Sequence, residues 1–189
     1  MQPRNKRDYP VEHARRILEP GPIVLVSSAH NGARNIMTMG WHTVMEFSPS
    51  LVGCIIAESN HSFDLIRKSK ECVINVPDAS LVDTVVAIGN CSGGETNKFT
   101  QFSLTAQKAK TVKAPLIGAC FAHFECTLHD ARLVKDYNFF IFEVTRALVA
   151  TAPKQPQTLH YCGQGIFTTD GKRLNKARNF TKWKDSATF

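Results

Sequence analysis

The clearest pattern of apolar and polar positions lies in three stretches of strand length. Residues 138–150 (NFFIFEVTRALVA) have the strongest strand pattern, rich in β-branched and aromatic side chains. Residues 119–133 alternate, with apolar side chains on one face and His123 and Glu125 on the other. Residues 51–57 (LVGCIIA) form a continuous apolar run instead. Such a run is typical of a strand that is covered on both faces.

Shorter patterns complete the expected order of elements. Four further strands are predicted at residues 23–28, 35–44, 72–76 and 161–168. Asn31-Gly32 is a hairpin signal between the first two, and Ser48-Pro49 breaks the second. Short helices are predicted at residues 11–18, 63–68 and 80–88. The last should be capped by Ser80, with Asp83 in the capping-box position and Gly89 at its end. Residues 99–104 and 111–116 have weaker patterns, expected to be partly irregular.

This mixture of elements predicts a mainly β protein with a few short helices. Many strands joined by turns rich in Gly, Pro and Asn favour a closed antiparallel barrel. Strands and helices do not alternate regularly, which argues against a doubly wound sheet. There is no G-x-G-x-x-G segment, so a Rossmann site is not indicated. At 189 residues without internal repeats, the chain fits one domain.

Composition and the start of the chain indicate where in the cell the protein is expected. The chain is 43% hydrophobic and 21% charged, ordinary values for a soluble globular protein. No apolar run approaches the roughly 20 residues that a bilayer-crossing helix needs. The basic start, MQPRNKRDYP, has no apolar segment behind it and so is not a secretory signal. We expect a cytoplasmic protein without a membrane partner.

The six cysteines show neither a C-x-x-C pair nor the spacing of a zinc site. Cys54, Cys72, Cys120 and Cys126 lie in apolar strand patterns and are expected to be buried free thiols. Cys91 and Cys162 lie in polar, glycine-rich surroundings and should be more exposed. We predict no redox pair and no metal site.

The net charge of +7 is concentrated at the two ends of the chain. Basic tails can bind nucleic acid, and Phe180 and Trp183 interleave with the last basic cluster. The middle of the chain has no basic helix and no nucleic-acid motif, so solvated ends, or a tail lying over a partner subunit, are the favoured interpretation. We therefore expect no nucleic-acid partner. A basic surface also attracts anionic cofactors, but charge alone does not identify them.

A polar corner follows the apolar run of residues 51–57. Ser59, Asn60, His61 and Ser62 precede a short helical pattern. A helix start offers free N–H groups and the positive end of the helix dipole, a natural place for a phosphate. The alternative is plain helix capping, which needs only one of these residues.

Seven short motifs occur in an order that resembles a known family. They are NIMT at 35–38, SP at 48–49, SNHS at 59–62, ECVINVP at 71–77, NKF at 97–99, APLI at 114–117 and LHY at 159–161. Together they resemble the flavin reductase-like FMN-binding split-barrel family, especially its flavoredoxin-like branch. The resemblance implies an FMN-binding split β-barrel, a Greek-key-like antiparallel barrel. It also implies one domain over residues 1–189, with its core at about 20–168 and a basic tail at 170–189.

The resemblance also implies a cofactor site. In the family the flavin phosphate lies at the corner matching residues 59–62, and the backbone of residues 38–41 would run beside the flavin ring. The cofactor-binding candidates are Asn35, Met37, Thr38, Met39, Gly40, Trp41, Ser59, Asn60, His61, Ser62, Asn97, Lys98 and Tyr161. The alternatives are an ordinary strand whose methionines pack in the core, and a solvated lysine at position 98.

His160 is the catalytic candidate that the resemblance implies. A histidine at the flavin edge could contact nicotinamide or assist proton transfer. A strand-end histidine that only satisfies a hydrogen bond is the alternative. The implied cofactor is FMN, with FAD as the alternative, and the implied electron donor is NADH or NADPH.

The function that the resemblance implies is NAD(P)H-dependent flavin reduction by hydride transfer. The alternatives are a flavoredoxin-like electron carrier with tightly bound FMN and a protein donor, and a non-catalytic flavin-binding barrel. The family further implies a homodimer with the flavin at the interface, and an oxygenase or electron-transfer protein as a partner. Hydride transfer onto a flavin needs no protein nucleophile, so the absence of a nucleophile elbow or H-E-x-x-H motif is consistent with this expectation.

Overall fold

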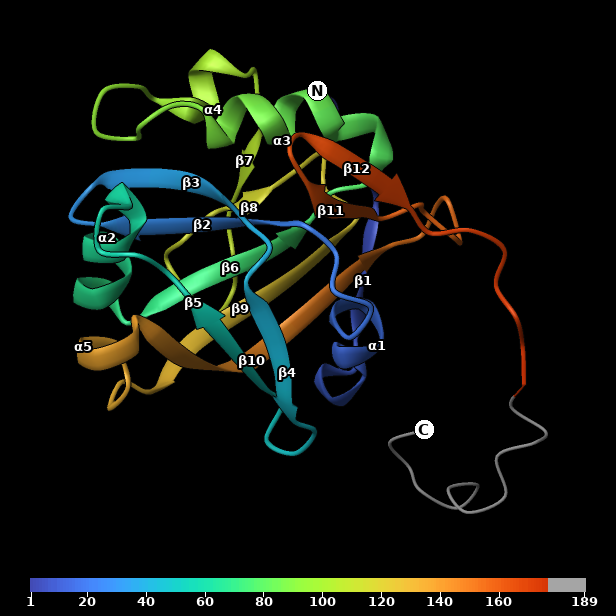
Figure 1. Cartoon of the computed structure of the whole chain (residues 1–189), viewed down its shortest axis with the longest axis horizontal. Helices are drawn as coiled ribbons and strands as arrows, with labels where there is room; N and C mark the ends of the chain where they lie inside the picture. The colour runs from blue at the N-terminus through green and yellow to red at the C-terminus, as the bar shows by residue number, and fades with distance from the viewer. Residues whose placement is uncertain (177–189) are drawn as a thin grey trace.

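The computed structural model describes residues 1–176 of the chain, mainly as antiparallel strands around one core (Figure 1). The strands are β1 (Lys6–Tyr9), β2 (Val24–His30), β3 (Ala33–Met39), β4 (His42–Glu46), β5 (Leu51–Ile55), β6 (Glu71–Val76), β7 (Ala106–Gln107), β8 (Leu116–Ile117), β9 (Ala122–Asp130), β10 (Phe139–Ala150), β11 (Leu159–Gly163) and β12 (Ile166–Thr169). The helices are η1 (Val11–His13), α1 (Arg15–Leu18), α2 (His61–Ser69), η2 (Ala79–Leu81), α3 (Val82–Gly89), α4 (Lys98–Gln101) and α5 (Val134–Tyr137). The mainly β prediction is confirmed.

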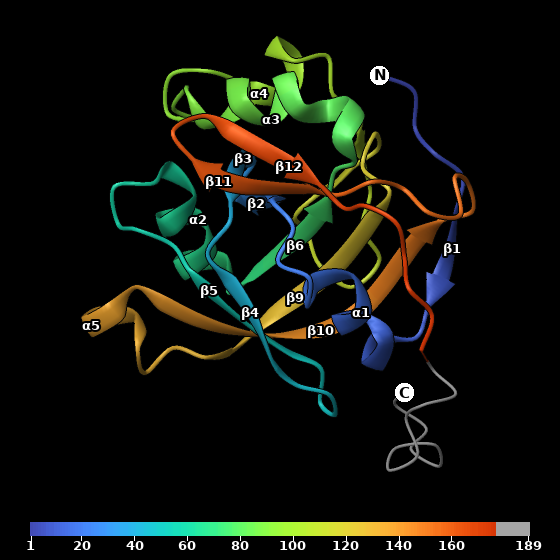
Figure 2. The same ribbon diagram turned by 45° about the vertical axis from the view of Figure 1, so that its right-hand side comes forward.

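One eight-stranded sheet organises the domain. Its order is β3-β2-β6-β9-β10-β5-β4, with β1 added to the far half of β10, and every pairing is antiparallel. β10 is the longest strand and pairs with β1, β5 and β9. The prediction of a strand over residues 138–150 is confirmed. Hairpin β11–β12 forms a separate two-stranded sheet that lies beside α3 (Figures 1 and 2).

The sheet curls as a barrel does, but its hydrogen-bonded ladder does not close. β3 and β4 are the two ends of the strand order, although only Gly40 and Trp41 separate them in the chain. The expected single strand over residues 35–44 is therefore two strands. After Met39 the chain turns from β2 to β5, where the Ile55 N–H donates to the Trp41 carbonyl at 3.0 Å. The expectation of a closed barrel is wrong in this respect, because β3 pairs with β2 and β4 pairs with β5, and β3 and β4 do not pair with each other.

The apolar positions that were predicted to face inward fill the interior. Phe124, Phe140 and Phe142 are fully buried, and the rings of the last two stack at 5.9 Å. Truncating a buried phenylalanine such as Phe142 costs about 3–5 kcal/mol. A second apolar cluster, which includes Ile36 and Ile88, lies beneath α3 and α4. Cys54, Cys72, Cys120 and Cys126 are buried free thiols, while Cys91 is half-buried and Cys162 is exposed, as expected.

Several local expectations were wrong because long-range contacts decide them. The turn before α3 is capped by Asp78, whose carboxylate accepts from the Ser80 N–H at 3.1 Å and from Arg4 at 2.6 Å, so Ser80 is not the cap. The last predicted strand is a hairpin that turns at Gln164-Gly165, both with positive φ. No helix within residues 1–176 is long and apolar enough to span a membrane.

Candidate functional site

The polar corner after β5 lies at the start of α2. Asn60 is the N-cap residue, in extended conformation, but no side chain caps this helix. Ser59, Asn60 and His61 line a hollow of about 320 Å³ together with Ser92. The first N–H groups of α2 therefore lack side-chain acceptors, which leaves the corner suited to an anion.

Ser62 lies behind this corner rather than in it. Its hydroxyl is fully buried and accepts from Asn35 Nδ2 at 3.0 Å, with Ser28 Oγ at 3.4 Å. The sequence-predicted phosphate role of Ser62 stays a prediction. What the structure shows is that Ser62 joins α2 to β3 and β2.

Asn35 is the residue at which the predicted segments meet. Its side chain is 3% exposed, and its Oδ1 has no hydrogen-bond partner among the described residues. Gly93 lies directly against this amide, so that a Cβ there would overlap it. A buried acceptor without a donor is costly unless a ligand or water supplies one. The position of Asn35 therefore fits a ligand that brings hydroxyl groups.

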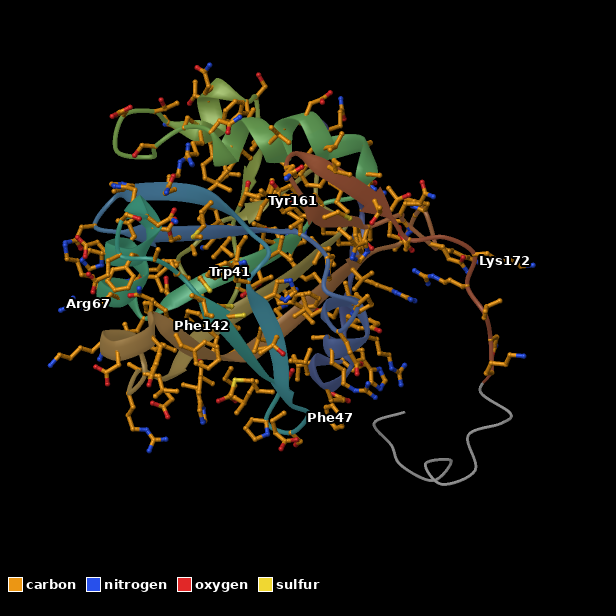
Figure 3. All side chains as sticks on the ribbon, in the orientation of Figure 1. Trp41, Phe47, Arg67, Phe142, Tyr161 and Lys172 are labelled. Carbon is orange, nitrogen blue, oxygen red and sulfur yellow. The ribbon has the colours of Figure 1, made fainter. Side chains whose placement is uncertain are left out.

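The far end of β3 forms the wall of a second hollow. Thr38, Gly40 and Trp41 line a space of about 450 Å³, opposite Val85, Val86 and Gly89 of α3 and Tyr161 of the hairpin. Thr38 Oγ1 donates to the Val85 carbonyl at 2.7 Å and so ties β3 to α3. Trp41 is 72% exposed and Tyr161 is 53% exposed, and Figure 3 shows both on the same side of the molecule.

Met37 and Met39 of the same strand point the other way. They are 6% and 4% exposed and belong to the main core cluster. Their side chains thus take the core role that was the alternative, and neither residue lines a hollow. Gly40 allows the close packing of the strand, since a Cβ there would lie 3.0 Å from Ile23 Cδ1.

The loop after α3, residues 90–97, borders three hollows in turn. Asn90 lines the aromatic one, Ser92 the corner, and residues 93–97 a third of about 560 Å³ shared with Arg34 and His61. Asn97 lines this third hollow and caps α4, with Oδ1 accepting from the Thr100 N–H at 3.3 Å. The loop therefore connects the corner to the aromatic hollow.

Lys98 is buried, which neither sequence interpretation anticipated. It is 5% exposed, and Nζ donates to the Ile88 carbonyl at 2.8 Å, near the negative end of α3. Burial lowers the pKa of Lys98, and nearby Cys91 opposes that shift. Lys98 thus binds the C-terminal end of α3 and does not line the hollow that Asn97 lines.

Arg34 is the cation that the sequence reasoning missed. It is exposed, lines the third hollow, and its guanidinium lies 4.8 Å from the centre of the Phe99 ring. Its position next to Asn35 in the NIMT segment was the available signal. A cation stacked on a ring beside free helix N–H groups is a suitable phosphate ligand.

His160 and Tyr161 lie on opposite faces of β11. Tyr161 faces the aromatic hollow, whereas the half-buried His160 does not line it. His160 Nε2 is 2.8 Å from Thr158 Oγ1, and Thr158 contacts Asp170. The structure therefore shows the hydrogen-bonding arrangement, and the catalytic role of His160 remains untested. Within residues 1–176 there is no group of three or more potential metal ligands.

Comparison with known proteins identifies the class. The family model described as "Flavin reductase like domain" matches residues 15–170, so the chain belongs to the flavin reductase-like family, as the motifs predicted. The uncharacterized protein YddH of Escherichia coli (strain K12) is 29% identical over 184 residues, which cover 89% of this chain and 97% of YddH.

Solved structures with the same fold agree with this family. An FMN-binding domain of a flavin reductases-like enzyme from Shewanella baltica OS155 superposes with a TM-score of 0.85 at 25% identity, covering 93% of this chain and 99% of that one. Flavoredoxin of Desulfovibrio vulgaris (Miyazaki F) superposes with a TM-score of 0.77 at 20% identity, covering 87% and 93%. The split-barrel fold is thereby established.

Proposed function

We propose that this protein is an FMN-binding oxidoreductase that takes a hydride from NADH or NADPH. The observation that carries the proposal is the set of three hollows that the loop of residues 90–97 borders, with the unsatisfied Oδ1 of Asn35 buried against Gly93 of that loop. An aromatic hollow at one end and a cationic, N–H-rich corner at the other match the two ends of a flavin mononucleotide. FAD would need further space beyond the corner.

Particular groups of this chain would hold each part of FMN. Arg34 and the first N–H groups of α2 would bind the phosphate, with Ser59, Asn60 and His61 around it. Asn35 Oδ1 would accept a hydrogen bond from a sugar-alcohol hydroxyl. The backbone of residues 38–41 and the rings of Trp41 and Tyr161 would border the flavin ring.

The flavin supplies the hydride-accepting chemistry when bound, and the protein positions the reactants. The exposed faces of Trp41 and Tyr161 would orient nicotinamide by stacking and keep water away from it. Thr38 fixes the end of β3 that precedes Trp41, because its hydroxyl is bonded to α3. His160 remains the candidate for nicotinamide contact or proton transfer.

We also propose that the protein acts as a homodimer with the flavin at the interface. β4 is an edge strand, and β4 and β5 carry exposed apolar side chains. Met45 is 43% exposed, Ile55 is 38% exposed and Phe47, just beyond β4, is 37% exposed. Trp41 borders both this face and the aromatic hollow, so a second copy packed here would help to enclose the cofactor.

A second candidate function is a flavoredoxin-like electron carrier that keeps FMN and receives electrons from another protein. The structural similarity to flavoredoxin favours it. A non-catalytic flavin-binding barrel is the third. In the reductase reading, the final acceptor would be a small molecule, an oxygenase or an electron-transfer protein.

One spectroscopic titration tests the proposal. The visible absorption spectrum of the purified protein is recorded under anaerobic conditions, then after adding NADH and then NADPH. We expect a flavin spectrum that one of the two donors bleaches. Bleaching only by dithionite would favour the electron carrier, and no flavin spectrum after incubation with FMN would overturn the cofactor assignment.

A further inference from the structure

A further cavity, larger than each of the three hollows described above, lies on another part of the molecule. It encloses about 660 Å³ between β1, α1, the loop after β10 and the segment after β12. Figures 1 and 2 show that the segment after β12 runs down past β1 and α1, and Figure 3 places Lys172 there. The volume is within the range of small-molecule sites, about 300–1,000 Å³.

The lining of this cavity is strongly basic. Its five cations are Arg7, Arg16, Lys154, Lys172 and Arg173. The single lining carboxylate, Asp170, is already engaged, since Oδ1 accepts from the Thr158 N–H at 2.5 Å and Oδ2 lies 3.9 Å from Arg173. Within residues 1–176 the other four cations form no ion pair. A concave surface lined by several cations has a focused positive potential, which favours the binding of an anion.

The floor of the cavity is apolar and ring-bearing. Tyr9, Ile17, Phe121 and Val149 contribute to it. Phe121 is 4% exposed, and Tyr9 is half-buried with its ring against His13 at 5.9 Å. An apolar floor beneath several cations suits a molecule that combines a flat ring with phosphate groups, rather than a simple inorganic ion.

Part of this cavity lies outside the family match. Arg7 and Tyr9 precede the family match at residues 15–170, and Lys172 and Arg173 follow it. Residues on either side of the family match are thus brought together beside the common fold. Arg7, Lys172 and Arg173 therefore share one surface, while residues 177–189 of the predicted basic tail, with Phe180 and Trp183, lie outside the described residues.

We propose that this cavity is a nucleotide-binding site, separate from the hollows along β3, which holds phosphate groups on its cations and a base on its apolar floor. The nucleotide could be the electron donor NADPH, through its 2′-phosphate and pyrophosphate, in which case the site rests on the proposed function. It could equally be an unrelated nucleotide. Binding itself does not depend on flavin chemistry.

Isothermal titration of the full chain with 2′,5′-ADP and with ADP tests the proposal without any redox reaction. The variant Arg16→Glu/Lys154→Glu should weaken nucleotide binding at least ten-fold, because it reverses two unpaired charges of the cavity. The control Arg67→Glu/Lys135→Glu makes the same change of net charge on exposed residues of α2 and α5 and should bind as the unmodified chain does. Binding should also weaken as salt is added.

The outcomes separate this site from the flavin site. Tighter binding of 2′,5′-ADP than of ADP would assign the site to NADPH, and equal binding would assign it to another nucleotide. FMN binding, followed by flavin fluorescence, should be the same in both variants. Absence of nucleotide binding, or an equal loss in the two variants, would overturn the proposal whether or not FMN binds.

Discussion

Asn35 shows how single side chains determine the chemistry of the site. It lies on β3, bonds to Ser62 of α2, and is covered by Gly93 of the loop after α3. Three segments that are distant in sequence thus fix one amide in place, with its oxygen buried against Gly93 and without a hydrogen-bond partner among the described residues. Side chains held in this way position a cofactor better than exposed loop residues do.

Gly93 tests this arrangement directly. We predict that Gly93→Ala weakens FMN binding at least ten-fold, because the new Cβ would displace the Asn35 amide. Gly171→Ala is the matched control, since its Cβ would meet nothing within 4 Å and Gly171 lines none of the three hollows. The measurement is a fluorescence titration with FMN, and equal affinities in the two variants would show that Asn35 does not contact the flavin.

Arg34 provides the second test at this scale. We predict that Arg34→Ala weakens FMN binding about ten-fold, which corresponds to about 1.4 kcal/mol, because a charge-assisted hydrogen bond to phosphate is lost. Arg67→Ala, an exposed arginine on α2, removes the same charge and should leave the affinity unchanged. Riboflavin, which lacks the phosphate, should bind equally well to the unmodified chain and to Arg34→Ala. A riboflavin loss as large as the FMN loss would place Arg34 elsewhere.

At the scale of elements, β6 and β9 share a buried polar network. His123 Nδ1 lies 2.7 Å from Asn75 Oδ1, and Asn75 Nδ2 donates to the Leu25 carbonyl at 2.9 Å. Burial, with the nearby Lys6 cation, lowers the pKa of His123 well below 6.5. The network therefore requires a neutral histidine in the folded protein.

This requirement predicts a loss of stability in acid. Below pH about 6.5 the unfolded chain takes up a proton at His123 that the folded chain does not, so the free energy of unfolding falls as pH decreases, by at most about 1.4 kcal/mol per pH unit for this group. His123→Gln should make the curve between pH 7 and 5 shallower, while His30→Gln, on a half-buried residue of β2, is the control. Urea unfolding at each pH gives the curves, and parallel curves for the unmodified chain and His123→Gln would contradict the assignment.

The sequence predicted those elements whose pattern is local. The strand patterns of residues 138–150 and 51–57 correspond to β10 and β5. Both could be predicted because the buried side chains of each strand follow one another within the strand itself. The cap at Asp78, the burial of Lys98 and the hairpin at residues 159–169 were missed because each depends on contacts with distant segments. The polar face of β9 is buried for the same reason, since Glu125 accepts from the N–H groups of Lys110 and Thr111 in a loop that covers it.

At the scale of the molecule, the site is open along one side unless something covers it. Trp41 is 72% exposed at the junction of the aromatic hollow and the apolar face of β4 and β5. Gly53 on that face lets the Phe139 ring and the Met45 side chain pack over it, because a Cβ there would overlap the Phe139 ring and meet Met45 Sδ at 2.9 Å. An exposed apolar face on an edge strand is suited to pair with its own copy.

The dimer proposal leads to the last prediction. We expect Met45→Glu to shift the protein from dimer to monomer in sedimentation velocity at micromolar concentration, because two copies would each bury a charge at the twofold interface. Leu174→Glu places the same charge on a side chain that is 75% exposed outside this face and should leave the dimer intact. The Met45→Glu monomer should also bind FMN more weakly, since the partner helps to enclose the flavin. A dimer that persists in Met45→Glu would move the interface elsewhere, and a monomer with unchanged FMN affinity would place the whole cofactor site within one chain.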